Sequence, residues 1–375
     1  MIFRALPARL ASVVWVAWVL LAGCSADKPP PTPLETYEPK IAGRAVWKAG
    51  FGNVGPLIAP VAIDGQFIVA TMAGDLIALQ ADDGAVRWQT RVGGPVSAGV
   101  GSDGRFVSVV TRGNEVVTFD SGREIWRKRV PSSVVTPPLV AGERVFVMGV
   151  DRAVQAFDAL DGRRLWTLQR PGDALTLAQA GVLAAFHNTL LVGQGARLAA
   201  VDPLRGTVLW ELPMASPRGS NEVERLADLI GPAVRVGDRV CARAFQSAVG
   251  CVDAARGAVL WTRGAGGANP VGGDADRVFG ADATDRMTAW NASTGDIVWS
   301  HEKLLYRGLS GGLAVGPVVA FGDVEGYVHF LSTATGEQQL RLPTDGSPVL
   351  GTPVLSGNTM LVVTKSGGLF AFRPN

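Results

Sequence analysis

Histidine and cysteine are scarce in this chain of 375 residues, which contains three of each. Three histidines are too few for a histidine-rich zinc site, and the sequence has no Gly-x-x-x-x-Gly-Lys-Ser/Thr phosphate loop. Glycine and proline, at 47 and 23 residues, fall short of a collagen-like or low-complexity composition. The sequence therefore predicts a folded protein that lacks the usual signatures of a zinc enzyme or a phosphate-loop enzyme.

An excess of either charge is also missing. The chain has 35 Lys and Arg residues against 33 Asp and Glu residues. Arg4 and Arg9 lie in a segment that we expect to be removed, so the mature chain is expected to be neutral. A neutral chain lacks the positive field that nucleic-acid binding requires, and we expect no nucleic-acid partner.

Residues 1–23 have the pattern of an export signal. Two arginines precede the run Leu10–Leu21, which is apolar apart from Ser12 and ends in small residues. This run is too short to span a bilayer, which favours a signal peptide over a transmembrane anchor.

The end of this segment, Leu21-Ala22-Gly23-Cys24, resembles the lipobox of bacterial lipoproteins. The resemblance implies that Cys24 becomes the acylated first residue, whereas the alternative is an ordinary signal peptide followed by a chance cysteine. Ser25, where aspartate would retain a lipoprotein in the inner membrane, implies an outer-membrane protein that faces the periplasm. The proline-rich residues 24–40 are then expected to form a stiff tether.

The other two cysteines, Cys241 and Cys251, would lie in an oxidising compartment. They are placed five residues on either side of Gln246. If residues 240–244 and 248–252 form a hairpin, the two cysteines face each other across it. The sequence leaves open a cross-strand disulfide or two buried free thiols.

The pattern Gly-x-x-x-Trp recurs through the chain, and successive Trp positions are 38 to 51 residues apart. A period near forty, with short alternating segments between turns, predicts the four-stranded blades of a β-propeller. Because the Trp recurs in every unit, we interpret it as a spacer between blades whose indole N–H finds a carbonyl partner, not as a ligand-binding residue. The eight copies, the last of which has lost its Trp, are Gly43–Trp47, Gly84–Trp88, Gly122–Trp126, Gly162–Trp166, Gly206–Trp210, Gly257–Trp261, Gly295–Trp299 and Gly336–Leu340.

The two ends of the chain complement each other. The last segment, Gly368–Arg373, matches the strand that precedes Gly-x-x-x-Trp in other units, and the strand missing after it is present at the other end as Gly43–Trp47. An N-terminal strand that completes the last blade would close the ring and remove its open edges. We therefore predict an all-β, eight-bladed propeller domain over residues 41–375.

One repeat, Ala289–Trp299 (AWNASTGDIVW), resembles the repeat of quinoprotein propellers. Two families share this repeat: dehydrogenases that bind pyrroloquinoline quinone, and BamB, a non-enzymatic lipoprotein family of the β-barrel assembly (BAM) machinery in Gram-negative outer membranes. Stretches that are similar to the BamB family in particular are 221–230 (NEVERLADLI), 300–309 and 321–329 (FGDVEGYVH). The resemblance covers essentially the whole mature chain.

A periplasmic quinone-dependent dehydrogenase is the alternative. Alcohol dehydrogenases of that type carry adjacent cysteines and a Ca²⁺ ion held by converging oxygen ligands. This chain has no adjacent cysteines, and its acidic residues follow ordinary turn positions. Sugar dehydrogenases of the same fold lack the cysteine pair, so this absence does not exclude them. His329 lies in an alternating strand, where a structural role is the default. We predict no catalytic residue, no cofactor and no metal.

Residues 213–231 lengthen one unit beyond the others. Asn221 and Glu224 have the spacing of a capping box, which predicts a short helix with Val223, Leu226 and Ile230 on one face. Such a helix could offer an interface or simply cover its own blade.

Residues 170–181 of the preceding unit also depart from the repeat. They place Leu175 and Leu177 outside any Trp-bearing strand. An interface and an ordinary buried strand are both open interpretations of this segment.

In the BamB family these two segments dock on the POTRA domains of BamA, through Leu-x-Leu-Arg and Asp-x-Asp. The resemblance implies that Leu175, Leu177 and Asp228 contact BamA here, while Ala178 replaces the Arg and Ile230 replaces the second Asp. One charge of each sign is lost, so we expect a more apolar contact. The resemblance implies a scaffold that binds BamA and other BAM subunits and aids insertion of outer-membrane barrel proteins. Their unfolded chains could pair with exposed strand edges.

Overall fold

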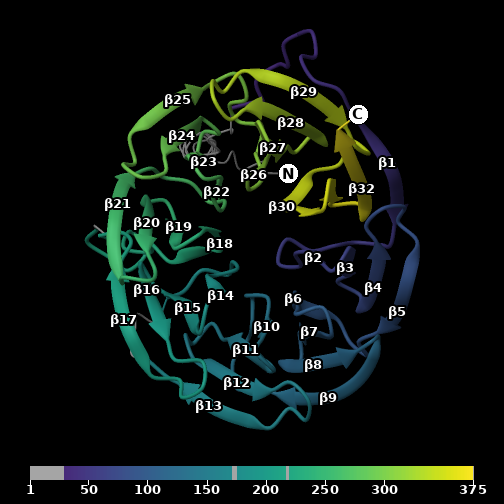
Figure 1. Cartoon of the computed structure of the whole chain (residues 1–375), viewed down its shortest axis with the longest axis vertical. Helices are drawn as coiled ribbons and strands as arrows, with labels where there is room; N and C mark the ends of the chain where they lie inside the picture. Colours follow the sequence, from purple (N-terminus) through teal and green to yellow (C-terminus); the bar gives the residue numbers. More distant parts are fainter. Residues whose placement is uncertain (1–28, 171–174, 217–218, 375) are drawn as a thin grey trace, which may run out of the picture. The chain divides into compact units, whose positions relative to one another are not determined.

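The computed structural model describes residues 29–170, 175–216 and 219–374, and the chain from Thr32 onward forms one compact unit. Its described residues contain 32 strands and no helix. The strands form eight four-stranded sheets that are arranged as blades around a ring (Figure 1). The predicted all-β, eight-bladed propeller is therefore confirmed. None of the described residues belongs to a helix long and apolar enough to cross a membrane.

In seven blades the strands follow chain order from the inside of the ring to the outside (Figure 1). The eighth blade has the order β30-β31-β32-β1. The bounds in the first four blades of the chain are β2 (Val61–Ile63), β3 (Gln66–Ala70), β4 (Asp75–Gln80), β5 (Val86–Arg91); β6 (Val96–Ser102), β7 (Phe106–Thr111), β8 (Glu115–Asp120), β9 (Arg123–Arg129); β10 (Leu139–Ala141), β11 (Arg144–Met148), β12 (Val154–Asp158), β13 (Arg164–Leu168); and β14 (Leu183–Phe186), β15 (Thr189–Gln194), β16 (Arg197–Val201), β17 (Val208–Pro213). Those in the last four blades are β18 (Leu229–Val236), β19 (Arg239–Ala244), β20 (Ala248–Asp253), β21 (Ala258–Gly264); β22 (Gly272–Gly273), β23 (Arg277–Ala281), β24 (Met287–Asn291), β25 (Ile297–His301); β26 (Leu313–Val315), β27 (Val318–Gly322), β28 (Tyr327–Ser332), β29 (Gln338–Pro343); and β30 (Val349–Ser356), β31 (Thr359–Thr364), β32 (Gly368–Pro374), β1 (Gly43–Gly50).

Burial within a blade follows the position of the strand. The two middle strands are buried on both faces, as in β3 and β7, because each blade is covered by its neighbours. This explains why the middle strands are nearly continuous apolar runs. The outer strands lie at the rim and keep many side chains in solvent, as in β5.

The tryptophans join neighbouring blades. Each of the seven tryptophans of the Gly-x-x-x-Trp pattern lies on an outer strand and packs against the Gly of that pattern in the next blade, as Trp166 does against Gly206. Five of the indole N–H groups donate to a backbone carbonyl of that next blade, at 2.8 to 3.0 Å, from Trp47, Trp126, Trp166, Trp261 and Trp299. The interpretation of the Trp as a spacer with a carbonyl partner is confirmed for these positions.

The ring closes as the sequence predicts. Strand β1 pairs antiparallel with β32, from Gly43 opposite Pro374 to Gly50 opposite Gly368. The unit without a tryptophan contacts this strand through Leu340. A Cβ added to Gly43 would lie 2.9 Å from the Cδ2 atom of Leu340. Leucine thus takes the place of the indole at the junction between the blade of β26 to β29 and the closing blade.

The prediction of a short helix around residues 221–230 is wrong. Asn221 does accept a hydrogen bond from the Glu224 N–H at 2.9 Å, so the capping contact forms. The chain, however, makes only a turn and then enters β18 at Leu229. Val223 is 71% exposed while Ile230 is buried, so the expected apolar face does not exist.

The predicted hairpin around the two cysteines is present as β19 and β20, with Cys241 directly opposite Cys251. Their sulfur atoms form a disulfide in the structure. Both cysteines are fully buried in a cluster with Trp261 and Trp290. The bridge thus links the two middle strands of a blade inside the core.

The last part of the expected tether packs against the propeller. The Thr32 N–H donates to the Leu305 carbonyl at 3.0 Å, and the Lys40 N–H donates to the Gln339 carbonyl at 2.9 Å. Leu34 packs against the core cluster that contains Trp299. The signal peptide and Cys24 lie outside the described residues.

Candidate interface at the inter-blade loops

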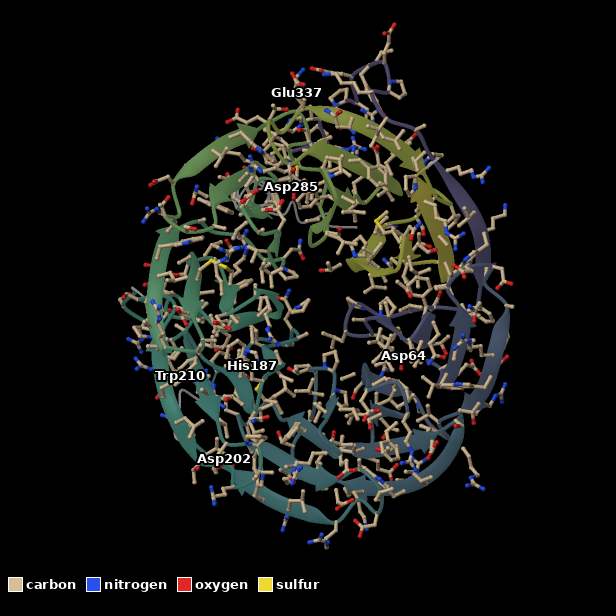
Figure 2. The ribbon with its side chains drawn as sticks, in the orientation of Figure 1. Asp64, His187, Asp202, Trp210, Asp285 and Glu337 are labelled. Carbon is tan, nitrogen blue, oxygen red and sulfur yellow. A yellow bond between two sulfur atoms is a disulfide. The ribbon has the colours of Figure 1, made fainter. Side chains whose placement is uncertain are left out.

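Strand direction alternates within each blade, so two kinds of loop gather on one face of the ring. These are the connections between blades and the hairpins between second and third strands. We call this the loop face. Both irregular segments singled out in the sequence are inter-blade connections, since one links β13 to β14 and the other links β17 to β18. Topology therefore brings these segments to the same face. Figure 2 shows the side chains around the ring in the same orientation as Figure 1.

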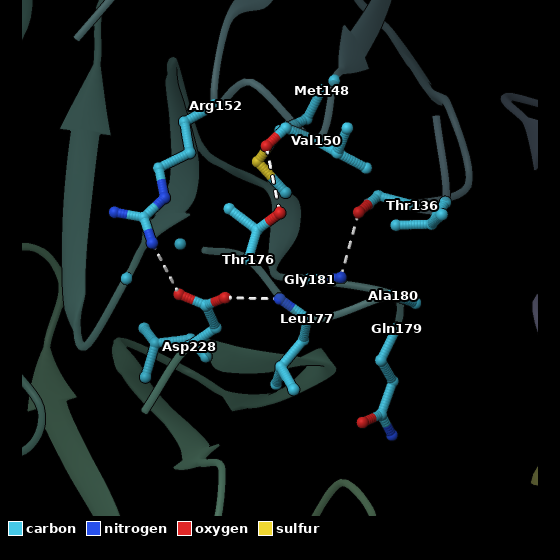
Figure 3. A pocket seen from close by; sticks show the side chains of 15 residues that line it. Thr136, Met148, Val150, Arg152, Thr176, Leu177, Gln179, Ala180, Gly181 and Asp228 are labelled. Atoms are coloured by element: carbon cyan, nitrogen blue, oxygen red, sulfur yellow. Dashed lines mark hydrogen bonds and ion pairs between the residues drawn. The ribbon is translucent and has the colours of Figure 1, made fainter. Parts of the chain in front are cut away.

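Asp228 is the centre of the contact between the two segments (Figure 3). One carboxylate oxygen accepts a hydrogen bond from the backbone N–H of Leu177 at 2.9 Å. The other oxygen lies 3.1 Å from an Nη2 nitrogen of Arg152. The same guanidinium nitrogen donates to the Leu175 carbonyl at 3.2 Å. Asp228 and Arg152 therefore hold the backbone of residues 175–177 from both sides.

Further bonds fix the rest of this segment. Thr176 donates to the Val150 carbonyl at 3.1 Å, and Gln179 donates to the Ala268 carbonyl at 2.6 Å. The Gly181 N–H donates to the Thr136 hydroxyl at 2.9 Å, and Gly181 also forms a β-bridge with Ile230. The segment is thus attached to several blades.

The Arg152–Asp228 pair is mostly removed from solvent, with side chains 15% and 17% exposed. A buried ion pair loses hydration, which offsets its electrostatic attraction. The role of this pair is to position the backbone, because Arg152 also bonds the Leu175 carbonyl and Asp228 bonds the Leu177 N–H. Removing either side chain would leave the other charge without its counterion in a mostly buried position. Asp228 is therefore a positioning residue as much as a contact residue.

The hollow beside this pair is small, at about 50 Å³. Cavities that hold small-molecule ligands or cofactors are typically several hundred Å³. The residues that line the hollow include Thr136, Met148, Leu177 and Gly181. Its size and lining fit a dimple in a protein-contact surface better than a substrate pocket.

The structure separates the candidate contact residues into three groups. Leu175 and Leu177 are partly exposed and Ala178 is exposed, so all three can be reached on the loop face. Asp228 joins them there through its bond to Leu177. Ile230 is only 1% exposed and pairs with Arg243 in β18 and β19, so its side chain is buried beneath the loop face. It supports the segment from below through its bridge to Gly181.

Arg152 is the member of this site that sequence reasoning missed. It lies in the hairpin between β11 and β12 with a φ of 63°. Nothing in its local sequence distinguishes it from other surface arginines, since its role depends on Asp228, 76 residues away. Only the ring arrangement of the blades brings the two together.

A second polar cluster lies in the segment 321–329, around the buried carboxylate of Asp323. Arg307 donates to it through Nε at 2.8 Å, and His329 lies 2.9 Å away through Nε2. The second carboxylate oxygen accepts the N–H groups of Glu325 and Tyr327, at 3.0 and 2.8 Å. Arg307, Asp323 and His329 are at most 1% exposed, so this cluster serves the core and has no access to a substrate.

The protonation states in this cluster follow from burial and partners. Burial lowers the pKa of His329, and this outweighs the nearby carboxylate of Asp323. Burial alone would raise the pKa of Asp323, but hydrogen bonds from His329, Tyr327 and Arg307 bring it below its ordinary value. Asp323 is thus charged and His329 neutral at neutral pH, which assigns His329 the structural role expected from its strand.

Across the residues that the structure describes, no group of three or more His, Cys, Asp or Glu side chains converges as a metal site would require. A quinone-dependent enzyme of this fold would need converging oxygen ligands for its Ca²⁺.

Comparison with known proteins places the chain in a family. The family described as "Outer membrane protein assembly factor BamB" matches residues 36–98 and 93–301. The chain belongs to the BamB family. It is 36% identical to the BamB of Burkholderia pseudomallei (strain K96243), over 97% of this chain and 98% of that one, and 34% identical to the BamB of Bordetella pertussis (strain Tohama I / ATCC BAA-589 / NCTC 13251), over 97% of each.

Solved structures with the same fold include BamB and enzymes. The crystal structure of BamB from Moraxella catarrhalis matches with a TM-score of 0.80 at 22% identity, over 88% of this chain and 99% of that one. A quinohemoprotein alcohol dehydrogenase from Comamonas testosteroni matches with a TM-score of 0.66 at 16% identity, over 88% of this chain and 76% of that one. At such identities the likeness concerns the fold alone. The curated BamB relatives, at more than 30% identity over nearly the whole chain, decide the family.

Proposed function

We propose that this BamB-family chain is a non-enzymatic scaffold of outer-membrane protein assembly, which binds the POTRA domains of BamA through its loop face. The observation that carries the proposal is the bond from the Leu177 N–H to Asp228, which holds an accessible aliphatic segment in place on that face. Leu175, Leu177 and Ala178 supply the apolar contact. A prepositioned segment binds with little further loss of conformational entropy, which favours affinity.

The proposed mechanism is mechanical support. The ring is closed, and its irregular segment is tied to several blades, so a partner held on it acquires a fixed orientation. We propose that the propeller holds the POTRA domains of BamA, with the other BAM subunits, in an arrangement that favours insertion of barrel proteins.

The proposed location is the periplasmic side of the outer membrane, with Cys24 acylated. This rests on the lipobox-like sequence before Cys24 and on Ser25 after it. Mass spectrometry of the envelope-purified protein tests it, since a mature chain that begins with a lipid-modified Cys24 is expected. An unmodified N-terminus at another residue would contradict the anchor.

The BamA contact is tested by affinity capture from gently solubilised envelopes. Wild-type protein is expected to recover BamA, and the double variant Leu175→Ala/Leu177→Ala is expected to lose it. The matched control is Leu160→Ala/Leu204→Ala, which removes two leucines that are 57% and 61% exposed in the hairpins between third and fourth strands, on the opposite face. Equal recovery by all three proteins would place the BamA contact elsewhere, and no recovery by any of them would reject the assembly function.

We also propose that unfolded barrel substrates pair with the outer strands of three adjacent blades. These strands, β17, β21 and β25, each expose two consecutive aliphatic side chains before the Trp. Exposed strand edges with apolar side chains suit the addition of an extended segment. Photo-cross-linkers at Leu209 and Leu260 are expected to capture nascent barrel proteins, whereas one at Arg87 is not. Absence of substrate at both leucine positions during barrel assembly would reject this proposal.

A further inference from the structure

Charge is distributed unevenly around the outer strands of the ring. Strands β1, β5 and β9 belong to three consecutive blades and together carry eight basic residues and one acidic residue. Strands β17, β21 and β25, on the other side of the ring, carry one of each sign (Figure 1). A chain that is neutral as a whole therefore concentrates positive charge on one part of its rim.

Most of this charge is not neutralised locally. Among the described residues, six of the eight basic side chains are exposed and take part in no ion pair within 4.0 Å. We call this set the basic rim, and it consists of Arg44, Lys48, Arg87, Arg123, Lys128 and Arg129. By contrast, Arg91 is paired with Asp75, and Arg127 is paired with Glu115 and Glu124. Unpaired exposed cations on adjacent strands create a field that attracts anionic surfaces.

A second feature is the docking of residues 32–40 on the blade next to the basic rim. Arg307 donates to the Thr32 carbonyl at 2.8 Å, and Lys303 pairs with Glu35 at 2.6 Å. Lys40 pairs with Glu337 at 2.8 Å, and the chain then enters β1, the first strand of the basic rim. These contacts attach the segment to the blade of β26 to β29, next to β1.

This docking shortens the chain that is free to act as a tether. Of the proline-rich residues 24–40, only the eight from Cys24 to Pro31 precede the docked segment. A fully extended chain spans at most about 3.3–3.6 Å per residue, so these eight residues reach about 26–29 Å. If Cys24 carries the lipid, as proposed above, Thr32 is held within about that distance of the bilayer surface.

We infer that the basic rim rests on the anionic headgroups of the membrane. The occupant is a lipid surface because the free tether before Thr32 is short, and the docked segment that follows it leads directly into β1, the first strand of the basic rim. Exposed Lys and Arg side chains are attracted to phosphate headgroups within a Debye length of the surface. The ring would then stand with this part of its rim against the bilayer, and its orientation would be fixed by the anchor and the rim together. This inference rests on the proposed lipid anchor only for the position of the membrane.

The experiment uses residues 25–375 without the lipid, because every blade and the closing strand lie beyond Thr32. Binding is measured by flotation with vesicles of phosphatidylcholine alone or with 30% phosphatidylglycerol, in 50 mM and 500 mM NaCl. We expect binding only to the anionic vesicles and its loss at high salt. The rim variant Arg87→Glu/Arg123→Glu/Lys128→Glu is expected to bind at least tenfold more weakly.

The matched control carries the same change in net charge at other exposed arginines, as Arg205→Glu/Arg225→Glu/Arg256→Glu. It is expected to bind within twofold of the unchanged chain. Equal weakening of both variants would show that net charge alone matters, and it would overturn the inference. So would binding to neutral vesicles, or no binding of the unchanged chain at low salt. Recovery of BamA by the rim variant separates this outcome from the proposed assembly function, which uses the loop face.

Discussion

The indole of Trp261 packs against Gly295 of the next blade so closely that a Cβ added to Gly295 would lie 2.6 Å from the ring. The indole N–H donates to the Ala292 carbonyl, three residues before that glycine, at 2.9 Å. The two residues that define the sequence repeat therefore meet across blades, not within one. Gly and Trp recur in the sequence because each such pair forms the contact between two neighbouring blades.

Gly295→Ala is expected to destabilise the propeller by about 2–4 kcal/mol, since the methyl group meets the indole and the φ of 74° disfavours a side chain. The control Gly316→Ala has a φ of 56° but no atom within 4 Å of the added Cβ. It isolates the backbone contribution and is expected to cost about 1–2 kcal/mol. Urea denaturation measures the free energy of unfolding of both variants. Equal losses of stability would show that the indole moves aside at no cost in free energy.

Replacement of both cysteines, Cys241→Ala/Cys251→Ala, is expected to lower the free energy of unfolding by about 2–3 kcal/mol, because the bridge closes a short loop in the unfolded chain. The disulfide joins residues that are ten apart on β19 and β20. Denaturation with and without a thiol reductant checks the cause. The wild type should approach the variant once reduced, whereas a gap that persists would mean that packing, not the bridge, is responsible.

The sequence predicted the architecture well because a propeller repeats one local contact. The spacing of Gly and Trp was sufficient to predict the eight blades. The unmatched strand at Gly43–Trp47 was sufficient to predict how the ring closes. The loop face was harder, because Asn221 and Glu224 form the predicted capping contact but the chain then enters β18 instead of a helix. Arg152 could not be found at all, since its partner is 76 residues distant and only the assembled ring joins them.

Asp228→Asn is expected to loosen the segment around Leu177 without removing an exposed contact atom. The amide side chain can still accept one hydrogen bond, but it loses the charge that pairs with Arg152. Hydrogen exchange at the Leu177 N–H, which donates to Asp228, is expected to accelerate by about tenfold, in line with the loss of about 1.4 kcal/mol. BamA capture should weaken in parallel.

A second variant, Arg152→Met, tests the same ion pair from the other side. It removes the cation and keeps a side chain of similar length. It should also accelerate exchange at Leu177 and weaken capture, although no role in direct contact is proposed for it. If Arg152→Met leaves exchange and capture unchanged while Asp228→Asn reduces capture, Asp228 acts as a contact residue alone.

Stability is expected to fall as the pH drops below about 6.5, and part of this loss belongs to His329. Burial lowers the pKa of His329 in the folded chain, whereas the unfolded chain has an ordinary histidine. Between the two values the unfolded state binds more protons, so stability is greatest above the unfolded pKa and is lost as the pH falls toward the folded one. The neutral ring is favoured further because its Nδ1 atom has no partner among the described residues.

The variant His329→Gln tests this assignment, since glutamine can still donate to Asp323 but does not titrate. Between pH 7.5 and pH 5.5, the wild type should lose up to about 1.4 kcal/mol more stability than the variant. Burial also lowers the pKa of His301, but that histidine is present in both proteins and its effect cancels in the difference. Parallel curves for the two proteins would mean that Asp323 and Arg307 accommodate a charged His329. In that case the proton would be shared within the cluster, and burial would not control it.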